Sequence, residues 1–179
     1  NSIILSTVKN SGAYFFLISA VETYLKKKNK KKYEIQLFEK KKFFFPFLFL
    51  IKNFFVFFFF NPIKVMNIRY NGYRIGRYTV PIIFKNYNSY LSKKNLIFNT
   101  MKCFYKTCCI VESSKNYLEN KKIESIFVDH CMYENGIIMD IFLDNKIKVF
   151  SLGYPKGIFS IENKNKKGIS YEDVIKLNK

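Results

Sequence analysis

The chain has 179 residues, of which 49% are hydrophobic and 25% are charged. This composition excludes an intrinsically disordered chain, and the length suits one globular domain better than two. The formal net charge of +18 has two explanations, a negatively charged partner or the residue bias of AT-rich codons. We favour the codon bias as the larger part, because Lys, Asn, Ile, Phe and Tyr are abundant and Trp is absent.

The first elements predict a βαβ unit. Residues 3–8 form a short apolar run typical of a buried strand, and a turn follows at residues 10–12. Residues 13–28 place apolar side chains at three-and-four spacing, which predicts a helix. Residues 33–38 alternate as a strand does. This order predicts neighbouring parallel strands joined by a right-handed crossover.

Residues 43–60 are almost wholly apolar and dominated by phenylalanine. Their number approaches the roughly 20 residues that span a bilayer. Pro46 near the start and Lys52 in the middle argue against a span, because a charge at the bilayer centre costs about 2.5–3.5 kcal/mol. Three alternatives stay open: a packed helix, which we favour, a helix at the membrane interface, and a membrane span.

The middle of the chain predicts a strand at 63–70, a loop at 71–77 and a long helix at 92–120. The core face of that helix is predicted to be Leu96, Phe98, Met101, Phe104, Tyr105, Cys108 and Val111.

A second βαβ crossover follows, with strands at 124–128 and 147–152 and a helix at 133–143. The predicted fold class is therefore α/β, a single Rossmann-like three-layer domain over residues 1–179 with a mainly parallel sheet. The chain begins without methionine and stops just after the opening turn of a further helix at 171–177, which indicates a fragment.

Asp129 and His130 are the candidate catalytic residues. They end a predicted strand, and ligands of open parallel sheets bind beyond the carboxyl ends of strands. A histidine can exchange a proton near neutral pH, or it can hydrogen-bond a sugar hydroxyl or a phosphate. Tyr133 and Glu134 run from there into the helix and are predicted to bind substrate. The alternative is that His130 caps the helix or fills a polar loop.

Two glycine turns are candidate substrate contacts. Ser11 and Gly12 follow the first strand and open the first helix, where backbone amides often meet an anion. The full G-x-G-x-x-G pattern is missing, which disfavours a dinucleotide. Gly72, Arg74 and Gly76 lie in a loop whose amides and guanidinium group could hold a phosphate. A plain tight turn is the alternative for both.

Other kinds of site are not expected. The cysteines form no CxxC pair and one histidine offers no zinc set, so we predict no metal, no cofactor and a reduced, cytoplasmic protein. No cleavable signal peptide is visible. The lysine runs at 26–32 and 164–167 lack interleaved aromatic residues on a nucleic-acid-binding scaffold, so nucleic acid is not an expected partner.

Two stretches resemble bacterial capsular and surface polysaccharide biosynthesis proteins, whose architecture is similar to GT-B glycosyltransferases. The first is N-G-Y-R-I-G at 71–76, similar to a G-x-x-I-G loop of that family, although the family continues with an acidic residue where this chain has Arg77. The second covers 123–153, and its matching residues are His130, Tyr133, Gly136, Asn145, Ile147 and Val149.

The resemblance implies a glycosyltransferase-like protein of capsular polysaccharide biosynthesis, and this chain would be its amino-terminal, acceptor-side half. A nucleotide-sugar donor would bind mainly to a missing carboxyl-terminal domain, and the acceptor would be a glycan or a lipid-linked glycan. The protein would be cytoplasmic, peripheral at the inner face of the plasma membrane, with an anionic membrane surface as a further partner. The alternative is a basic, membrane-associated structural or scaffolding protein anchored by residues 43–60.

Overall fold

The structure, a computed structural model, describes residues 2–7, 33–59, 61–85, 93–128, 133–153 and 157–161. The chain divides into two compact units. We name them the sheet unit, within Asn1–Phe38, Leu118–Cys131 and Phe142–Lys179, and the helical unit, within Glu39–Tyr117 and Met132–Ile141.

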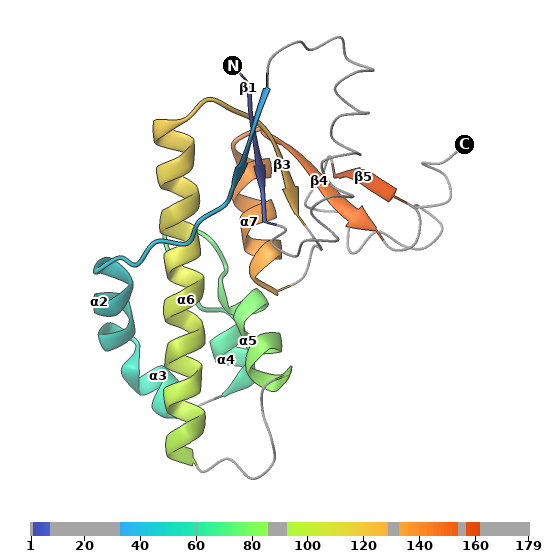
Figure 1. The fold of residues 1–179 in the computed structure, drawn as a ribbon. Helices are drawn as coiled ribbons and strands as arrows, with labels where there is room; N and C mark the ends of the chain where they lie inside the picture. The colour runs from blue at the N-terminus through green and yellow to red at the C-terminus, as the bar shows by residue number, and fades with distance from the viewer. Residues whose placement is uncertain are drawn as a thin grey trace. The chain divides into compact units, whose positions relative to one another are not determined.

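The sheet unit contains five strands in the order β2-β1-β3-β4-β5 (Figure 1). The strands β1 to β4 are parallel, whereas β5 pairs with β4 antiparallel. The fold is therefore α/β with a parallel four-stranded sheet. The α/β class and the mainly parallel sheet were predicted, whereas β5 was not. The strand bounds are Ser2–Ser6 (β1), Tyr33–Leu37 (β2), Ile123–Val128 (β3), Lys148–Gly153 (β4) and Gly157–Ile161 (β5).

The central strands form the core of the sheet unit. Ile4 and Leu5 of β1 are buried, and five of the six residues of β3 are buried as well. The ring of Phe127 in β3 stacks on that of Phe150 in β4, with ring centroids 4.8 Å apart. Such near-continuous apolar strands are typical of parallel sheets that are covered on both faces.

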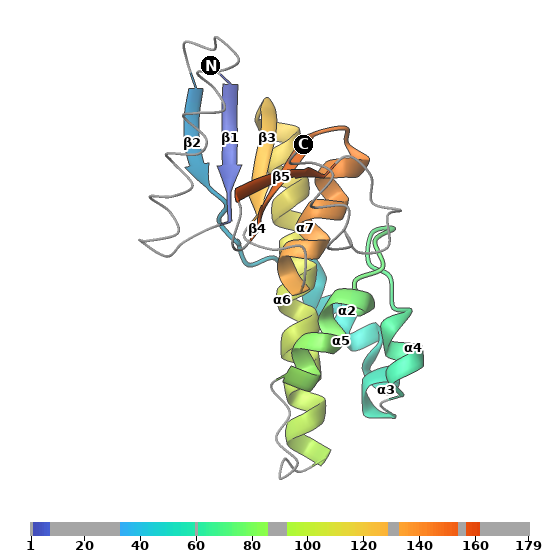
Figure 2. The same cartoon turned by 90° about the vertical axis from the view of Figure 1, so that its right-hand side faces the viewer.

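The helical unit is built along the long helix α6, as both views show (Figures 1 and 2). Phe57 of α3 contacts Phe104 of α6 with ring centroids 4.9 Å apart, and Thr79 of α5 contacts Thr107 of α6. The helices are Phe45–Lys52 (α2), Phe54–Phe58 (α3), Pro62–Met66 (α4), Gly76–Lys85 (α5), Lys93–Asn120 (α6) and Tyr133–Asp144 (α7). The last three residues of α6 and of α7 are counted with the sheet unit.

Within the predicted segment 43–60, residues 45–58 form two short helices instead of one. The helix α2 ends at Lys52, and the side-chain amide of the next residue, Asn53, donates a hydrogen bond to the Phe49 carbonyl oxygen (2.9 Å). The helix α3 then begins at Phe54. Among the described residues, no helix is long and apolar enough to cross a bilayer.

The strand predicted at 63–70 is wrong, because residues 62–66 form the helix α4. Asn61 caps this helix: its side-chain oxygen accepts hydrogen bonds from the backbone N–H groups of Ile63 (3.0 Å) and Lys64 (3.2 Å). An Asn cap followed by proline in the first turn is a strong helix start signal, and here it outweighs the strand-like apolar run.

The helix predicted at 92–120 is confirmed as α6, and that predicted at 133–143 is confirmed as α7. Phe104, Cys108 and Val111 are buried as expected, but Phe98 is 67% exposed. At this end of α6 the buried residue is Thr100. Residues two apart lie on opposite sides of a helix, so Phe98 is on the exposed side. The helices predicted at 13–28 and 171–177 lie outside the described residues.

Candidate functional site

The order of the strands defines a switch point at the carboxyl ends of β1 and β3. From β1 the chain goes first to β2 on one side and later to β3 on the other. The two strand ends are joined, because the Thr7 N–H donates to the Phe127 carbonyl oxygen (3.0 Å). In open α/β sheets, ligands bind at such a point, because the connections diverge there and leave a crevice.

The candidate catalytic residues follow this point in the sequence. Asp129 and His130 come directly after Val128, the last residue of β3, and Ser11 and Gly12 come a few residues after β1. All four lie outside the described residues, so their roles stay predictions.

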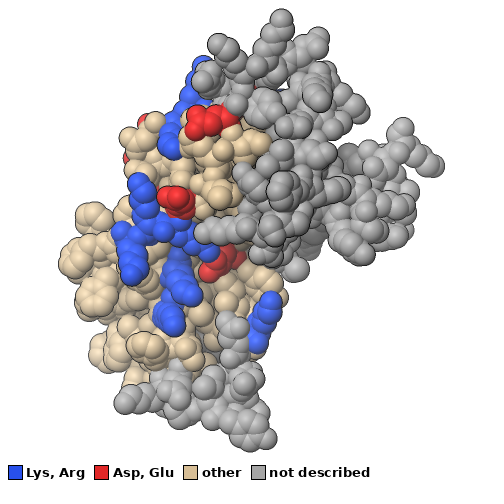
Figure 3. All heavy atoms as spheres, viewed as in Figure 1, with Lys and Arg blue, Asp and Glu red and all other residues tan. Residues whose placement is uncertain are grey.

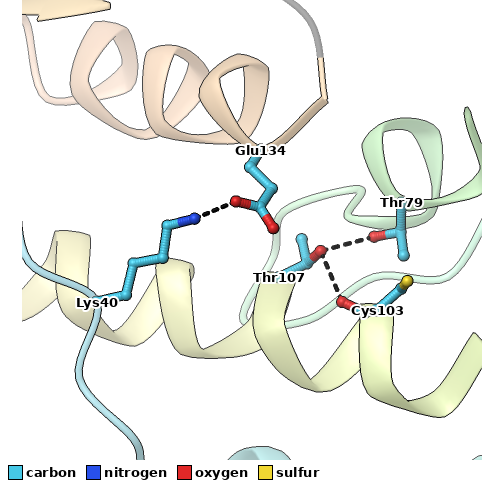
Figure 4. Close-up of polar contacts among 5 residues, drawn as sticks. All are labelled: Lys40, Thr79, Cys103, Thr107 and Glu134. Atoms are coloured by element: carbon cyan, nitrogen blue, oxygen red, sulfur yellow. Dashed lines mark hydrogen bonds and ion pairs between the residues drawn. The ribbon is translucent and has the colours of Figure 1, made fainter. Parts of the chain in front are cut away.

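Glu134 lies in the first turn of α7, within the helical unit, where a negative charge is favoured by the helix dipole. Its carboxylate forms an ion pair with the ammonium group of Lys40 and accepts a hydrogen bond from it (Figure 4). Lys40 lies in the segment before α2. Both side chains are partly exposed, so the pair contributes at most about 1 kcal/mol to stability. Lys40 was not among the predicted site residues, because it lies 94 residues from Glu134 in the chain and no local pattern links the two.

Tyr133 begins α7 with an uncommon backbone φ of 53°. The Lys85 ammonium nitrogen lies 5.3 Å from the centroid of its ring, a cation–π contact between α5 and α7. A second contact joins the same two helices, because the Tyr78 hydroxyl donates to the Asp140 carboxylate (2.6 Å). The helices α5 and α7 therefore pack against each other, through residues of α5 that follow the stretch 71–76.

A small network of hydroxyl groups lies below Glu134 in Figure 4. The Thr79 hydroxyl is 3.0 Å from the Thr107 hydroxyl, which donates to the carbonyl oxygen of Cys103 (3.0 Å). Both threonines are fully buried, so the network holds α5 against α6 and offers no group to a ligand.

The predicted loop at 71–77 begins with a tight two-residue hairpin turn, and its last two residues already belong to α5. Tyr70 and Tyr73 exchange both backbone hydrogen bonds (2.9 and 3.0 Å). Asn71 and Gly72 between them have positive φ values of 50° and 88°. Both values are typical of a type I′ turn, for which Asn-Gly is the strongest short-range signal in a sequence. This turn type was not predicted from the sequence.

Gly76 and Arg74 have structural partners. A Cβ atom at Gly76 would lie 2.0 Å from the Val65 carbonyl oxygen, so only glycine fits where α5 begins. The guanidinium group of Arg74 donates to the Met66 carbonyl oxygen (3.2 Å) and to the Asn67 side-chain oxygen (2.5 Å). These contacts account for Gly76 and Arg74 without a phosphate, and the predicted substrate contact of Gly72, Arg74 and Gly76 stays a prediction.

Two of the described cysteines, Cys103 and Cys108, are not activated. Cys103, Cys108 and Cys109 are free thiols. Burial is the main cause that raises the pKa of Cys108 and, to a smaller extent, the pKa of Cys103. The nucleophilic form of a thiol is the thiolate, so neither residue is suited to covalent catalysis at neutral pH.

Glu112 of α6 is the only carboxylate bonded to the hairpin by a contact that the described residues show. It accepts hydrogen bonds from the Tyr70 hydroxyl (2.7 Å) and the Asn71 side-chain amide (2.6 Å). Burial and this bond raise the pKa of Tyr70 above its ordinary value, which keeps the phenol neutral. No group of His, Cys, Asp and Glu within the described part of the chain could hold a metal ion.

Comparisons of the chain with protein-family models, with curated proteins and with solved structures found no match.

Proposed function

We propose that this chain is the acceptor-side domain of a glycosyltransferase-like protein of cell-surface polysaccharide synthesis, working at the cytoplasmic face of the membrane. The observation that carries the proposal is the switch point at the ends of β1 and β3. Asp129 and His130 follow that point directly in the sequence, and both belong to the stretch that resembles the polysaccharide biosynthesis family.

The chemistry of glycosyl transfer fits these two residue types. The acceptor hydroxyl oxygen bonds to the anomeric carbon of the donor sugar while the bond from that carbon to the phosphate oxygen breaks and the nucleotide leaves. The hydroxyl loses its proton in this step, and an imidazole accepts a proton near neutral pH. In this proposal His130 is that base and Asp129 orients its ring. Tyr133 and Glu134, at the start of α7, would contact the acceptor.

A further support is that α5 contacts α7 through Tyr78–Asp140 and Lys85–Tyr133, so the helix that begins with the proposed acceptor contacts has a fixed partner. The nucleotide-sugar donor would bind mainly to a separate domain, so the chain alone would bind such donors poorly.

The test is genetic and chemical. In the organism that produces the protein, the gene is deleted and then restored as the wild type, as His130→Ala, or as Lys122→Ala, a change at an exposed lysine. Surface polysaccharide is measured by its sugar content after acid hydrolysis, and protein amounts by immunoblot. We expect the His130 variant to lower polymer synthesis by about 100-fold or more, as the loss of a general base does, and the Lys122 variant to have no effect.

An unchanged amount and composition of polysaccharide after gene deletion would overturn the proposal. If deletion removes the polymer and the His130 variant restores it fully, the function stands and His130 is not the base.

A further inference from the structure

The helices α2 and α3 expose the side of a helix that soluble proteins bury. In α2 only Pro46 and Leu50, one turn apart, are buried, and in α3 only Phe57 is buried. Phe49 is half-buried against the ring of Tyr70, and the other apolar side chains of the two helices and of the flanking Phe44 and Phe59 are exposed. The most exposed of them, which we name the Phe surface, are Phe44, Phe45, Phe47, Ile51, Phe55 and Phe59, with 51–72% of each side chain exposed.

An apolar area of this kind marks an interaction site in a folded protein. A surface helix normally carries its polar residues outward, whereas here the outward residues are aromatic and aliphatic. The question is therefore what covers the Phe surface.

The charges around it identify the partner. Lys41 and Lys42 precede α2, and Lys52 ends it; all three are exposed. The sequence contains no Asp or Glu between Glu39 and Glu112, so every charged residue in that part of the chain is Lys or Arg. Figure 3 shows Lys and Arg side chains gathered beside the uncharged surface on the side of α2 and α3, with Asp or Glu side chains next to them on the side away from that surface.

We infer that the Phe surface inserts into the interfacial region of an anionic lipid bilayer, with the neighbouring lysines bound to lipid headgroups. Aromatic side chains and lysines together are the composition of interfacial membrane helices. A bilayer supplies both the apolar layer and the negative charge, whereas a second copy of the chain would bring another positive surface into contact with the first. The short helices α2 and α3 fit a position in the interface, since no described helix is long and apolar enough to cross.

This inference rests on the Phe surface and its charges, and it holds or fails independently of the proposed glycosyltransferase function. Polysaccharide measurements do not test it, and vesicle binding does not test the function.

The experiment is co-sedimentation of the full chain with two kinds of vesicle, pure phosphatidylcholine and phosphatidylcholine containing phosphatidylglycerol. The first variant combines Phe45→Ser, Phe55→Ser and Phe59→Ser, and the second combines Lys41→Gln, Lys42→Gln and Lys52→Gln. The matched control combines Lys122→Gln, Lys146→Gln and Lys148→Gln, which are exposed lysines of the sheet unit. Circular dichroism checks that every variant is folded.

We expect the wild-type chain to bind the anionic vesicles at least about tenfold more tightly than the neutral ones. The phenylalanine variant loses at least about tenfold in binding to both, because less apolar area enters the bilayer. The lysine variant loses at least about tenfold on anionic vesicles only, and the control keeps most of its binding.

Three results would overturn the inference. The first is equal binding of the wild-type chain to both vesicles, and the second is unchanged binding of the phenylalanine variant. The third is self-association of the lipid-free chain in sedimentation velocity that the phenylalanine changes abolish, combined with no vesicle binding; that result assigns the Phe surface to a second copy of the chain.

Discussion

The strand β3 and the helices α2 and α3 are both highly apolar, yet they have opposite environments. In β3 five of six residues are buried within the sheet, whereas in α2 and α3 three residues are buried and most others are exposed. Hydrophobic side chains in the first case build a core, and in the second they are left for a partner. An apolar sequence therefore shows that a segment needs covering but not what covers it.

The two regions should also be stabilised differently. The sheet is held by strand pairing and buried side chains, as in the contact of Phe127 with Phe150. The segment from α2 to α5 depends on a few buried anchors and on local backbone devices: a helix cap, a hairpin turn and one close glycine contact. Four predictions test this difference, from the largest expected effect to the smallest.

Phe57→Ala should lower the free energy of unfolding by about 3–5 kcal/mol, because its fully buried ring contacts Phe104 of α6 and its loss leaves a cavity. Phe127→Ala in β3 should have an effect of the same size. Urea denaturation followed by circular dichroism measures both. A loss below about 1 kcal/mol for Phe57→Ala, with the full loss for Phe127→Ala, would show that α3 is not anchored.

Gly76→Ala should lower the free energy of unfolding by about 1–3 kcal/mol, because the new Cβ atom would meet backbone atoms that cannot move aside easily. Gly72→Asn is the matched control: position 72 has open space and a positive φ that asparagine tolerates. Its loss should stay below that of Gly76→Ala in the same urea titration. The reverse order would contradict the close contact of α5 with α4.

Asn61→Ala should destabilise the helical unit by about 1 kcal/mol, because α4 loses the side chain that accepts hydrogen bonds from two of its first N–H groups. Asn61→Asp keeps an acceptor at the cap and should be nearly neutral. Thermal unfolding compares the two variants with the wild type. Equal melting temperatures for all three proteins would show that the cap contributes nothing.

Phe55→Ala should change the free energy of unfolding by no more than about 0.5 kcal/mol, although Phe55 is only two residues from Phe57 in the same helix. Its side chain is 72% exposed, so its removal leaves no cavity. The same urea titration measures it. A loss comparable with that of Phe57→Ala would mean that the Phe surface is packed within the protein, and the contrast with β3 would disappear.

The sequence predicted the parallel strands and the helices α6 and α7, because long apolar periodicity and strand alternation depend on nearby residues alone. It also placed Asp129 and His130 at the end of β3 in the chain. It failed at 63–70 and at the hairpin, although the cap at Asn61 and the pair Asn71–Gly72 were readable local signals.

Tertiary structure alone decided the rest. The antiparallel strand β5, the pairing of Lys40 with Glu134 and the contact of Tyr78 with Asp140 join residues whose partners no local pattern can specify. The same is true of the exposure of the Phe surface. Whether an apolar helix face is buried or exposed depends on which elements pack against it, and that is a property of the folded chain.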